Sequence, residues 1–462
     1  MFLTKAPSLR QVMFFIIGLT VLRVLYLFLV PLPLSGDEAQ YWVWAQHPAA
    51  GYFSKPPFIA WAIAVSTWLG DGAAWVRLGS PLAQGGTACC LLFLGRRMGG
   101  DSVGAWAGLL YVSLPAVFLS SILASTDVYL LFFCALTWLL LVHKKEFSGG
   151  IAFGLGLLSK YAALFLLPVF IVLARRRVLW LLLPALLLLI PNALWNLSHG
   201  GSTWHHTGEN IRGGGLTFSP KHLLEFVSGQ VLMGGLVTIL LGVALWRRGW
   251  RLAGDHKIAL LLSLLPFGLI AVQAILSRAN PNWAAVGYLG AVLLVAIIGV
   301  SRGWEAWLRR AVVVHIVVAV IALSIPWWSG ALPWKRDPLR RLVGMETLTE
   351  QFLALRQREC PMCKILTRDR MQTALLLYYG RGQIGLDDIS VYDPAPVATH
   401  HFSLCCNVRE RHEGAFLTFS REDMGNMRDY FSAVEVVGEV QAITHPGRTL
   451  NITVYRVSNW RE

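Results

Sequence analysis

Long apolar runs recur through most of the chain and constrain its fold more than any other feature. They repeat as far as Trp328 and then stop. From Lys335 onward, charged residues are frequent and no apolar run is long enough to span a bilayer. The 462 residues are 55% hydrophobic and only 14% charged, whereas soluble globular proteins carry about 25% charged residues. We therefore expect an all-α polytopic membrane domain at residues 1–330 and a small soluble α/β domain at residues 331–462.

Clusters of basic residues between the apolar runs predict the orientation of the membrane domain. Such clusters favour the cytoplasmic side, and placing all of them there gives about eleven crossings of bilayer length. The soluble domain then faces the periplasm. The net charge of +14 reflects these clusters and does not indicate nucleic-acid binding. The expected spans are residues 12–32, 74–95, 103–122, 127–142, 149–160, 161–174, 178–196, 222–246, 257–276, 283–301 and 311–328.

Two apolar segments need separate interpretation. The first span is too long for the apolar region of a signal peptide, and no small-residue cleavage site precedes Asp37, so we expect it to be retained. Residues 57–69 are apolar but short, and a crossing there would reverse the side of Arg96 and Arg97. We expect an interfacial or re-entrant helix, which Pro56 and Pro57 would begin.

Asp37 and Glu38 follow the first apolar run directly, where a membrane helix leaves the bilayer. Ionisable groups at such depth are costly to place and usually functional. The predicted topology puts further polar residues on the same face. The candidates for phosphate binding are Lys55, Arg77, Lys160 and Arg278, and the other polar residues are Gln40, Tyr41, Tyr52, Asp127, Tyr161, His205, His206, Arg212 and Asn282.

This group suits transfer chemistry on a substrate with a lipid tail and a phosphate. Asp37 and Asp127, with Glu38 in support, could act as a general base or hold a divalent cation. The basic side chains could bind a phosphate leaving group, and the remaining residues could contact substrate. Structural readings stay open: Asp127 could only cap a helix, and Lys55 and Lys160 could only extend toward the interface. His205 and His206 could be ordinary loop residues.

Several motifs in this region resemble the GT-C glycosyltransferases, within the family of protein O-mannosyltransferases and lipid A aminoarabinose transferases. The resemblance is strongest over residues 30–160. Two further stretches, LWNLSHGGSTWHHTG and RANPNW, look like those of bacterial members. The main motifs are GDEAQYW, KPPFIAW, WVRLGSPLA, ASTDVYLLFF and GLLSKYAALFLLP.

The resemblance implies many transmembrane helices, juxtamembrane helices in the first loop and an inverting sugar transfer on the periplasmic face of the inner membrane. The implied donor is an undecaprenyl-phosphate-linked sugar. Asp37 matches the catalytic acidic residue, Asp127 the second aspartate, and Lys55 the lysine that contacts the donor phosphate. Aminoarabinose transferases carry arginine three residues after the first aspartate, where this chain has Gln40. Arg77 or Lys160 are candidates to supply that charge.

The soluble part contains four of the seven cysteines, namely Cys360, Cys363, Cys405 and Cys406. An oxidising periplasm favours disulfides, and we expect one or two bonds linking the first pair of cysteines to the second. A zinc site is a weaker alternative, because two adjacent cysteines suit metal ligation poorly. The pattern also predicts strands at residues 364–366, 415–419, 434–440 and 450–457 and helices at residues 348–358, 371–380 and 421–431.

Three functions remain open from the sequence. The first is a glycosyltransferase that modifies lipid A, another lipid or a glycan. The second is a related enzyme with a secreted protein as acceptor. The third is a transporter that uses Asp37 and Asp127 as coupling carboxylates, although internal repeats typical of transporters are not evident.

Overall fold

The computed structural model describes residues 7–212, 218–248, 254–340, 342–395, 397–409, 414–420, 429–445 and 448–461. Contacts divide the chain into two compact units. Unit 1 comprises residues 1–29 and 49–323, and unit 2 comprises residues 30–48 and 324–462. The C-terminal boundary lies close to the expected division near residue 330. The segment 30–48, which carries Asp37, groups with the C-terminal residues instead of with the membrane helices.

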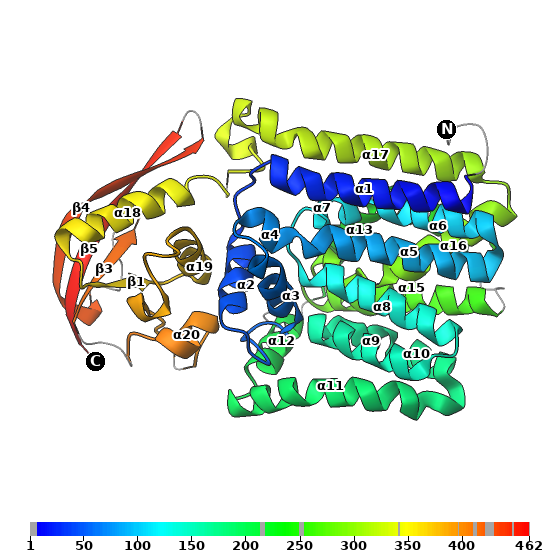
Figure 1. The fold of residues 1–462 in the computed structure, drawn as a ribbon, viewed down its shortest axis with the longest axis horizontal. Coiled ribbons are helices and arrows are strands. Elements are labelled where there is room, and N and C mark those ends of the chain that lie inside the picture. The colour runs from blue at the N-terminus through cyan, green and yellow to red at the C-terminus, as the bar shows by residue number, and fades with distance from the viewer. Residues whose placement is uncertain are drawn as a thin grey trace. The chain divides into compact units, whose positions relative to one another are not determined.

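Unit 1 consists of helices that lie side by side (Figure 1). The α-helices are α1 (Leu9–Leu29), α3 (Phe58–Trp68), α4 (Ala73–Arg77), α5 (Gly79–Gly99), α6 (Asp101–Ser113), α7 (Pro115–Ser120), α8 (Thr126–Val142), α9 (Glu146–Ser159), α10 (Leu167–Ala174), α11 (Val178–Ser198), α12 (Ser202–Arg212), α13 (Pro220–Gly234), α14 (Leu236–Arg248), α15 (Asp255–Leu276), α16 (Gly287–Ser301) and α17 (Glu305–Trp328). Short 3-10 turns are η1 (Tyr161–Leu166), η2 (Arg175–Arg177) and η3 (Pro281–Ala284).

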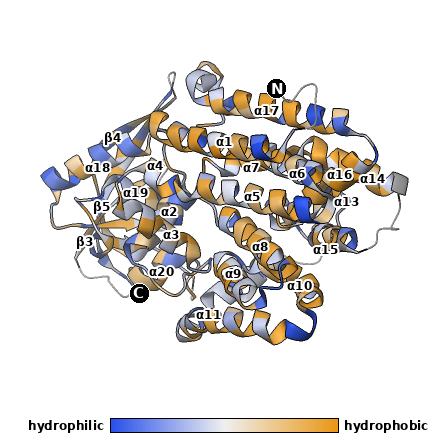
Figure 2. Ribbon diagram, turned by 45° about the vertical axis from the view of Figure 1, so that its right-hand side comes forward, coloured by the Kyte–Doolittle hydropathy of each residue, from blue (hydrophilic) through white to orange (hydrophobic). Residues whose placement is uncertain are grey.

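Helix α16 forms the centre of unit 1. Every residue from Gly287 to Gly299 is buried, and α16 packs against α5, α6, α14 and α15. Helices α1, α11 and α17 instead expose large apolar side chains, including Phe14, Leu187 and Val320. Apolar residues dominate these helices along their length (Figure 2). Extensive exposed apolar surface of this kind is expected of helices that face lipid.

Five helical stretches are long and apolar enough to cross a membrane, judged by length and composition among the described residues. They are Leu9–Leu29, Ala73–Gly99, Tyr161–Ser198, His256–Leu276 and Glu305–Ala331. The count rises to six if the bent pair α13 and α14 forms one span. Helices occupy all the expected spans, but the predicted number of eleven crossings is not confirmed. Shorter apolar helices, α8 and α16 among them, account for much of the difference.

The expected span at residues 222–246 is occupied by two helices, because the chain bends by 112° between α13 and α14. Gly235 provides the bend with φ 53° and ψ −136°, a backbone conformation that essentially requires glycine. The Leu236 backbone N–H then donates to Nε2 of His315 on α17 at 3.0 Å. A bend of this kind leaves backbone groups unpaired, and His315 satisfies one of them.

The short apolar segment at residues 57–69 forms α3, which begins directly after Pro57. It packs against α4, α8 and α9. The helix is only 11 residues long, too short to span a bilayer without distortion. Its expected interfacial position stays a prediction.

Unit 2 contains α2 (Gly36–Gln46) and a C-terminal domain with a five-stranded sheet of order β2-β1-β3-β5-β4. Strand β1 pairs in parallel with β2 and β3, whereas β5 pairs antiparallel with β3 and β4. The strands are β1 (Lys364–Thr367), β2 (Ile389–Val391), β3 (Ala415–Ser420), β4 (Phe431–His445) and β5 (Arg448–Trp460), and the helices are α18 (Met345–Glu359), α19 (Arg370–Tyr379) and α20 (His401–Cys406), with 3-10 turns η4 (Ser329–Ala331), η5 (Trp334–Arg336) and η6 (Leu386–Asp388).

The four expected strands are present, and the expected helices at 348–358 and 371–380 correspond to α18 and α19. Strand β2 and helix α20 were missed, because runs of three and six residues carry too little periodicity to recognise. Most of the helix expected at 421–431 lies outside the described residues, and Phe431 belongs to β4. The small α/β domain is therefore confirmed as a fold.

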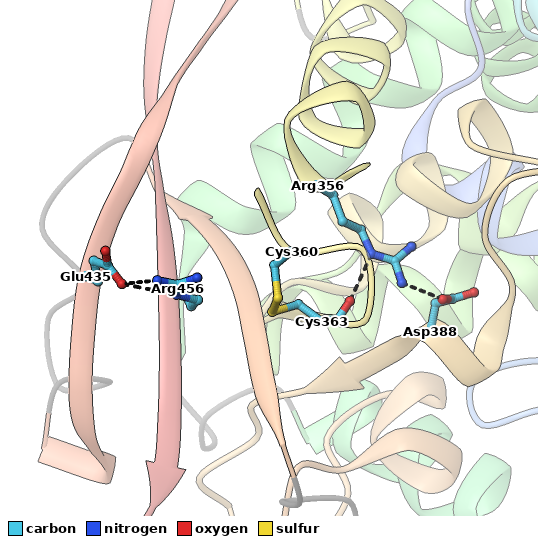
Figure 3. The surroundings of a disulfide bond; sticks show 6 residues. All are labelled: Arg356, Cys360, Cys363, Asp388, Glu435 and Arg456. Atoms are coloured by element: carbon cyan, nitrogen blue, oxygen red, sulfur yellow. Dashed lines mark hydrogen bonds and ion pairs between the residues drawn. A yellow bond between two sulfur atoms is a disulfide. The ribbon is translucent and has the colours of Figure 1, made fainter. Parts of the chain in front are cut away.

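The expected disulfide pairing is wrong. Each cysteine pairs within its own motif, Cys360 with Cys363 and Cys405 with its neighbour Cys406. The first bond closes the turn between α18 and β1 (Figure 3). Such local pairing needs no approach of distant segments, which explains why the proposed link between the motifs was unnecessary.

Arg356 lies beside the first disulfide and ties the end of α18 to the sheet (Figure 3). Its Nε donates to the Cys363 carbonyl at 2.8 Å, and its Nη2 donates to Oδ1 of Asp388 at 2.7 Å. Burial alone would raise the pKa of Asp388, but the Gly385 N–H and Arg356 outweigh that effect and hold the pKa below its usual value.

The bend at Gly235 generates a stability prediction. A Cβ at this position would meet the His315 ring, and the positive φ is strained for alanine. We expect Gly235→Ala to lower the free energy of unfolding by about 1–3 kcal/mol, measured as a lower midpoint of thermal unfolding in detergent. The control is Gly242→Ala, because open space surrounds Gly242. Equal midpoints for both variants would contradict this account of the bend.

The disulfide pairing can be checked by peptide mapping without reduction. Trypsin should release Glu359–Lys364 and Gly382–Arg409 as separate peptides, each containing both of its cysteines. We expect each peptide to be lighter by two hydrogen atoms than its reduced form. A single cross-linked product containing both peptides would restore the rejected pairing.

Candidate active site

Asp37 and Glu38 lie in the first turn of α2, where they have different roles. Ser35 is the N-cap residue, and its hydroxyl accepts a hydrogen bond from the Glu38 backbone N–H at 3.4 Å. The Glu38 carboxylate accepts in return from the Ser35 N–H at 3.0 Å. This reciprocal capping box fixes the start of the helix. It gives the buried Glu38 a structural function, while the Asp37 side chain remains 52% exposed.

Arg370 is the cation beside Asp37. Its Nη1 donates to Oδ1 of Asp37 at 2.8 Å and to Oε1 of Gln40 at 2.6 Å. All three residues belong to unit 2. Sequence reasoning missed Arg370, because the contact joins residues 333 positions apart. The only local signal was a charged triplet, Arg368 to Arg370, at the start of a predicted helix.

A second charged cluster forms inside unit 1 from three elements. Asp127 lies in the first turn of α8, Lys160 follows the last residue of α9, and Asn282 lies in η3. Lys160 Nζ contacts Oδ1 of Asp127 at 2.7 Å, and Asn282 Nδ2 donates to Oδ2 at 2.9 Å. The side chains of Asp127 and Lys160 are 13% and 16% exposed. Both oxygens of the aspartate thus have a donor, as a mostly buried carboxylate requires.

A network of neutral hydrogen bonds extends from the residue next to Lys160. The Tyr161 hydroxyl donates to the side-chain oxygen Oδ1 of Asn192 at 2.6 Å. The side-chain Nδ2 of Asn192 donates to the backbone carbonyl of Ala50 at 2.8 Å. The Thr203 hydroxyl donates to the Tyr52 carbonyl at 2.7 Å. These bonds attach residues 49–52 to α11 and α12. They therefore position the chain that leads to Lys55.

The other predicted site residues are more dispersed. Arg77 is only 2% exposed at the end of α4, whereas Arg278 is exposed. His206 lies against the Phe53 ring, with centroids 5.4 Å apart. Tyr41 is buried in α2, Lys55 is partly exposed, and His205 is exposed in α12. Of Arg212 only the helical backbone falls within the described residues.

The candidate metal site at Asp37 and Asp127 gains no support. Among the described residues, no group of three or more His, Cys, Asp or Glu side chains could hold a metal ion. The two acids belong to different units, and the partners seen for each are cationic or amide groups. The zinc alternative also gains no support, because the four C-terminal cysteines form disulfides.

Known proteins with similar sequences decide the family. A family model described as dolichyl-phosphate-mannose-protein mannosyltransferase matches residues 54–195. The lipid A galacturonosyltransferase RgtD of Rhizobium johnstonii is 33% identical over 415 residues, which cover 82% of this chain and 87% of that protein. This chain belongs to the protein O-mannosyltransferase-type GT-C glycosyltransferases.

Solved structures agree with this assignment at the level of the fold. The structure of ArnT from Cupriavidus metallidurans in the apo state matches with a TM-score of 0.63, and that of the same protein bound to undecaprenyl phosphate matches with 0.65. Each match covers 96% of this chain and 97% of the ArnT chain at 14% sequence identity. Together with the match to RgtD, these structures confirm the GT-C fold, the multi-pass membrane class and the glycosyltransferase activity expected from the motifs.

Membership of the family gives the two charged clusters a context. The matched segment, residues 54–195, contains Lys55, Arg77, Asp127 and Lys160. It excludes Asp37, Arg370 and Asn282. The cluster around Asp127 is therefore built partly from the region that defines the family model and partly from η3.

The pair formed by Asp127 and Lys160 generates a prediction. Lys160→Met would leave a mostly buried carboxylate without its cation, so we expect a loss of about 1–3 kcal/mol of unfolding free energy. Adding Asp127→Asn should recover part of that loss, because the uncompensated charge is then removed. Thermal unfolding of the purified protein measures both effects.

Lys221→Met provides the matched control, since its pair with Glu225 is exposed and should change stability by less than about 0.5 kcal/mol. If Lys160→Met proved as stable as this control, the pair would have no structural role. If the double variant lost more than the single one, Asp127 would not depend on Lys160 for its charge.

Proposed function

We propose that this glycosyltransferase moves a sugar from a polyprenyl-phosphate donor to a lipid acceptor, lipid A first among the candidates, at the periplasmic face of the inner membrane. The observation that carries the proposal is the match to a lipid A galacturonosyltransferase over most of both chains. The similarly folded ArnT has been solved with undecaprenyl phosphate, which supports the donor class. A galacturonosyl or related uronosyl donor is the first to test.

Asp37 is the proposed general base. It would take the proton from an acceptor hydroxyl while that oxygen attacks the anomeric carbon of the donor sugar. The bond from the anomeric carbon to the phosphate oxygen breaks on the opposite face, which inverts the configuration and releases polyprenyl phosphate. A half-exposed carboxylate is suited to this role because an acceptor can reach it.

Cations are needed where negative charge develops on the leaving phosphate. Lys55, Arg77, Lys160 and Arg278 are the proposed sources. Lys160 already pairs with Asp127, so a donor phosphate would compete with that carboxylate for the ammonium group. Tyr41, Tyr52, Tyr161, His205, His206 and Arg212 stay proposals for contacts with the sugar or acceptor.

The proposed orientation follows from the two ends of α8. Asp127 lies in its first turn, whereas Lys144 and Lys145 follow its last residue. Helix α9 returns the chain, so Lys160 lies at the same end as Asp127. Basic residues favour the cytoplasmic side, which leaves the cluster of Asp127 and Lys160 at the periplasmic side.

A protein acceptor is the second candidate, and the name of the matched family model favours it. Similarity to RgtD covers far more of the chain than that model does, 82% against residues 54–195, so a lipid acceptor is preferred. The transporter alternative receives no support from either comparison.

The decisive experiment uses purified wild-type protein, a synthetic uronosyl polyprenyl phosphate and an isolated lipid A fraction, with products identified by mass spectrometry. We expect a lipid product from the wild type. Asp37→Asn should lower turnover by at least about 100-fold, because the proton acceptor is lost, while Asp71→Asn, an exposed loop acid, should behave as wild type.

Each component of the proposal can fail separately. Wild-type turnover in Asp37→Asn would remove the base assignment. Sugar found on secreted proteins instead of lipid would favour the second candidate. Absence of transfer to any envelope acceptor, in cells as well as in the purified reaction, would overturn the proposed function as a whole.

A further inference from the structure

Arg370 occupies a position that its own helix does not require. Asp369, the N-cap residue of α19, accepts hydrogen bonds from the backbone N–H groups of Met371 and Gln372 at 2.9 Å. Its carboxylate is therefore committed to capping. Arg368 turns to the face of the Tyr392 ring, 5.5 Å from its centroid. Of the charged triplet, Arg370 is the member directed at α2.

The guanidinium of Arg370 connects two side chains of α2 through a single nitrogen. Both N–H groups of Nη1 are used, one for Asp37 and one for Gln40. Asp37 and Gln40 are three residues apart and therefore lie on the same face of the helix. This arrangement holds one oxygen of Asp37 in a defined direction and leaves the other oxygen without a contact to Arg370.

The packing between α2 and α19 fixes the position of the contact between Arg370 and Asp37. A Cβ on Gly36 would collide with Met371, so glycine permits close approach at this end. Farther along, the rings of Trp42 and Tyr378 meet edge-on with centroids 5.1 Å apart. Helices α2 and α19 therefore run parallel, and their N-terminal turns lie together. The positive ends of both helix dipoles favour a carboxylate at that location.

His400 does not compete for the role of neutralising Asp37. It lies close enough to Arg370 to interact electrostatically, and burial lowers its pKa from the usual value. His400 is thus neutral at pH 7. Arg370 is the cation that pairs with Asp37 in the described part of unit 2.

We propose that Arg370 is a positioning residue for the catalytic base: a helix of the C-terminal domain supplies the guanidinium that orients the Asp37 carboxylate toward the acceptor. This inference rests on the proposed function, in which Asp37 is the base. It gives the C-terminal domain a part in positioning the catalytic base.

The test compares Arg370→Gln with an exchange variant, Gln40→Arg combined with Arg370→Gln. Because the two side chains are in contact, the exchange moves the guanidinium to α2 while keeping it within reach of Asp37. We expect Arg370→Gln to lower kcat by about 100-fold, the effect of a misplaced catalytic group, and to change the donor KM by less than about threefold. The exchange variant should recover most of kcat.

Two controls separate orientation from other effects. Arg456→Gln removes an arginine from a comparably exposed ion pair with Glu435, within the same domain, and should retain wild-type kcat. Met371→Ala loosens the packing against α2 without removing charge, and should lower thermal stability while lowering kcat far less than Arg370→Gln does. All variants are also scored in cells by the amount of envelope product in a strain that lacks the wild-type gene.

Three results would overturn the inference: wild-type kcat in Arg370→Gln, an exchange variant no better than the single variant, or a loss in Met371→Ala equal to that in Arg370→Gln. A wrong donor assignment would give a different result. In that case the purified wild type is inactive with the polyprenyl donor, while the ranking of variants by product formed in cells still tests Arg370.

Discussion

Polar side chains inside an apolar helical body must find partners, and this requirement organises unit 1. An unpaired buried amide or carboxylate is costly, and several polar residues there meet this requirement by joining elements that are distant in sequence. Asn192 bonds both the Tyr161 hydroxyl and the Ala50 carbonyl. Asp127 bonds Lys160 and Asn282. The apolar surfaces hold the helices together without specifying which loop lies against which helix, and these few bonds provide that specification.

The ion pair at the proposed site in unit 2 follows a different principle, because it is partly exposed. The pair of Asp37 and Arg370 has side chains that are 52% and 34% exposed. Exposed ion pairs contribute little to stability, typically under about 1 kcal/mol. Close packing of α2 on α19 at Gly36 and Trp42 is the stronger source of cohesion. The ion pair therefore gains its significance from orienting a carboxylate, since the packing already determines where the helix lies.

The features that depend on local sequence pattern were predictable from the sequence. Apolar length located the helices of unit 1, and alternation located four strands of the sheet. The bend at Gly235 was invisible, because an isolated glycine in an apolar run is ordinary and the His315 partner comes from another helix. The disulfides were assigned to the wrong partners for the opposite reason: a distant link was preferred where neighbouring cysteines sufficed.

The types of residue in the site were predictable, but the predicted set was incomplete. Asp127 and Lys160 were recognised separately, and the structure brings them within 2.7 Å. The positive charge that Gln40 does not supply was sought at Arg77 or Lys160, both on membrane helices or their ends, because a pattern read along the chain suggests near neighbours. Arg370 lies in the C-terminal domain, far along the chain from the predicted site residues, and only its contact with α2 identifies it.

The grouping of residues 30–48 with the C-terminal residues changes how that domain is understood. Helix α2 follows α1 directly in sequence, yet its contacts are with α19. Asp37 is therefore carried by unit 2, and Lys55, Asp127 and Lys160 are carried by unit 1. Any rearrangement within the C-terminal domain that shifts α19 must also shift the proposed base, because Gly36 and Trp42 fix α2 to it. A substitution in α19 can thus affect catalysis without touching a single membrane helix.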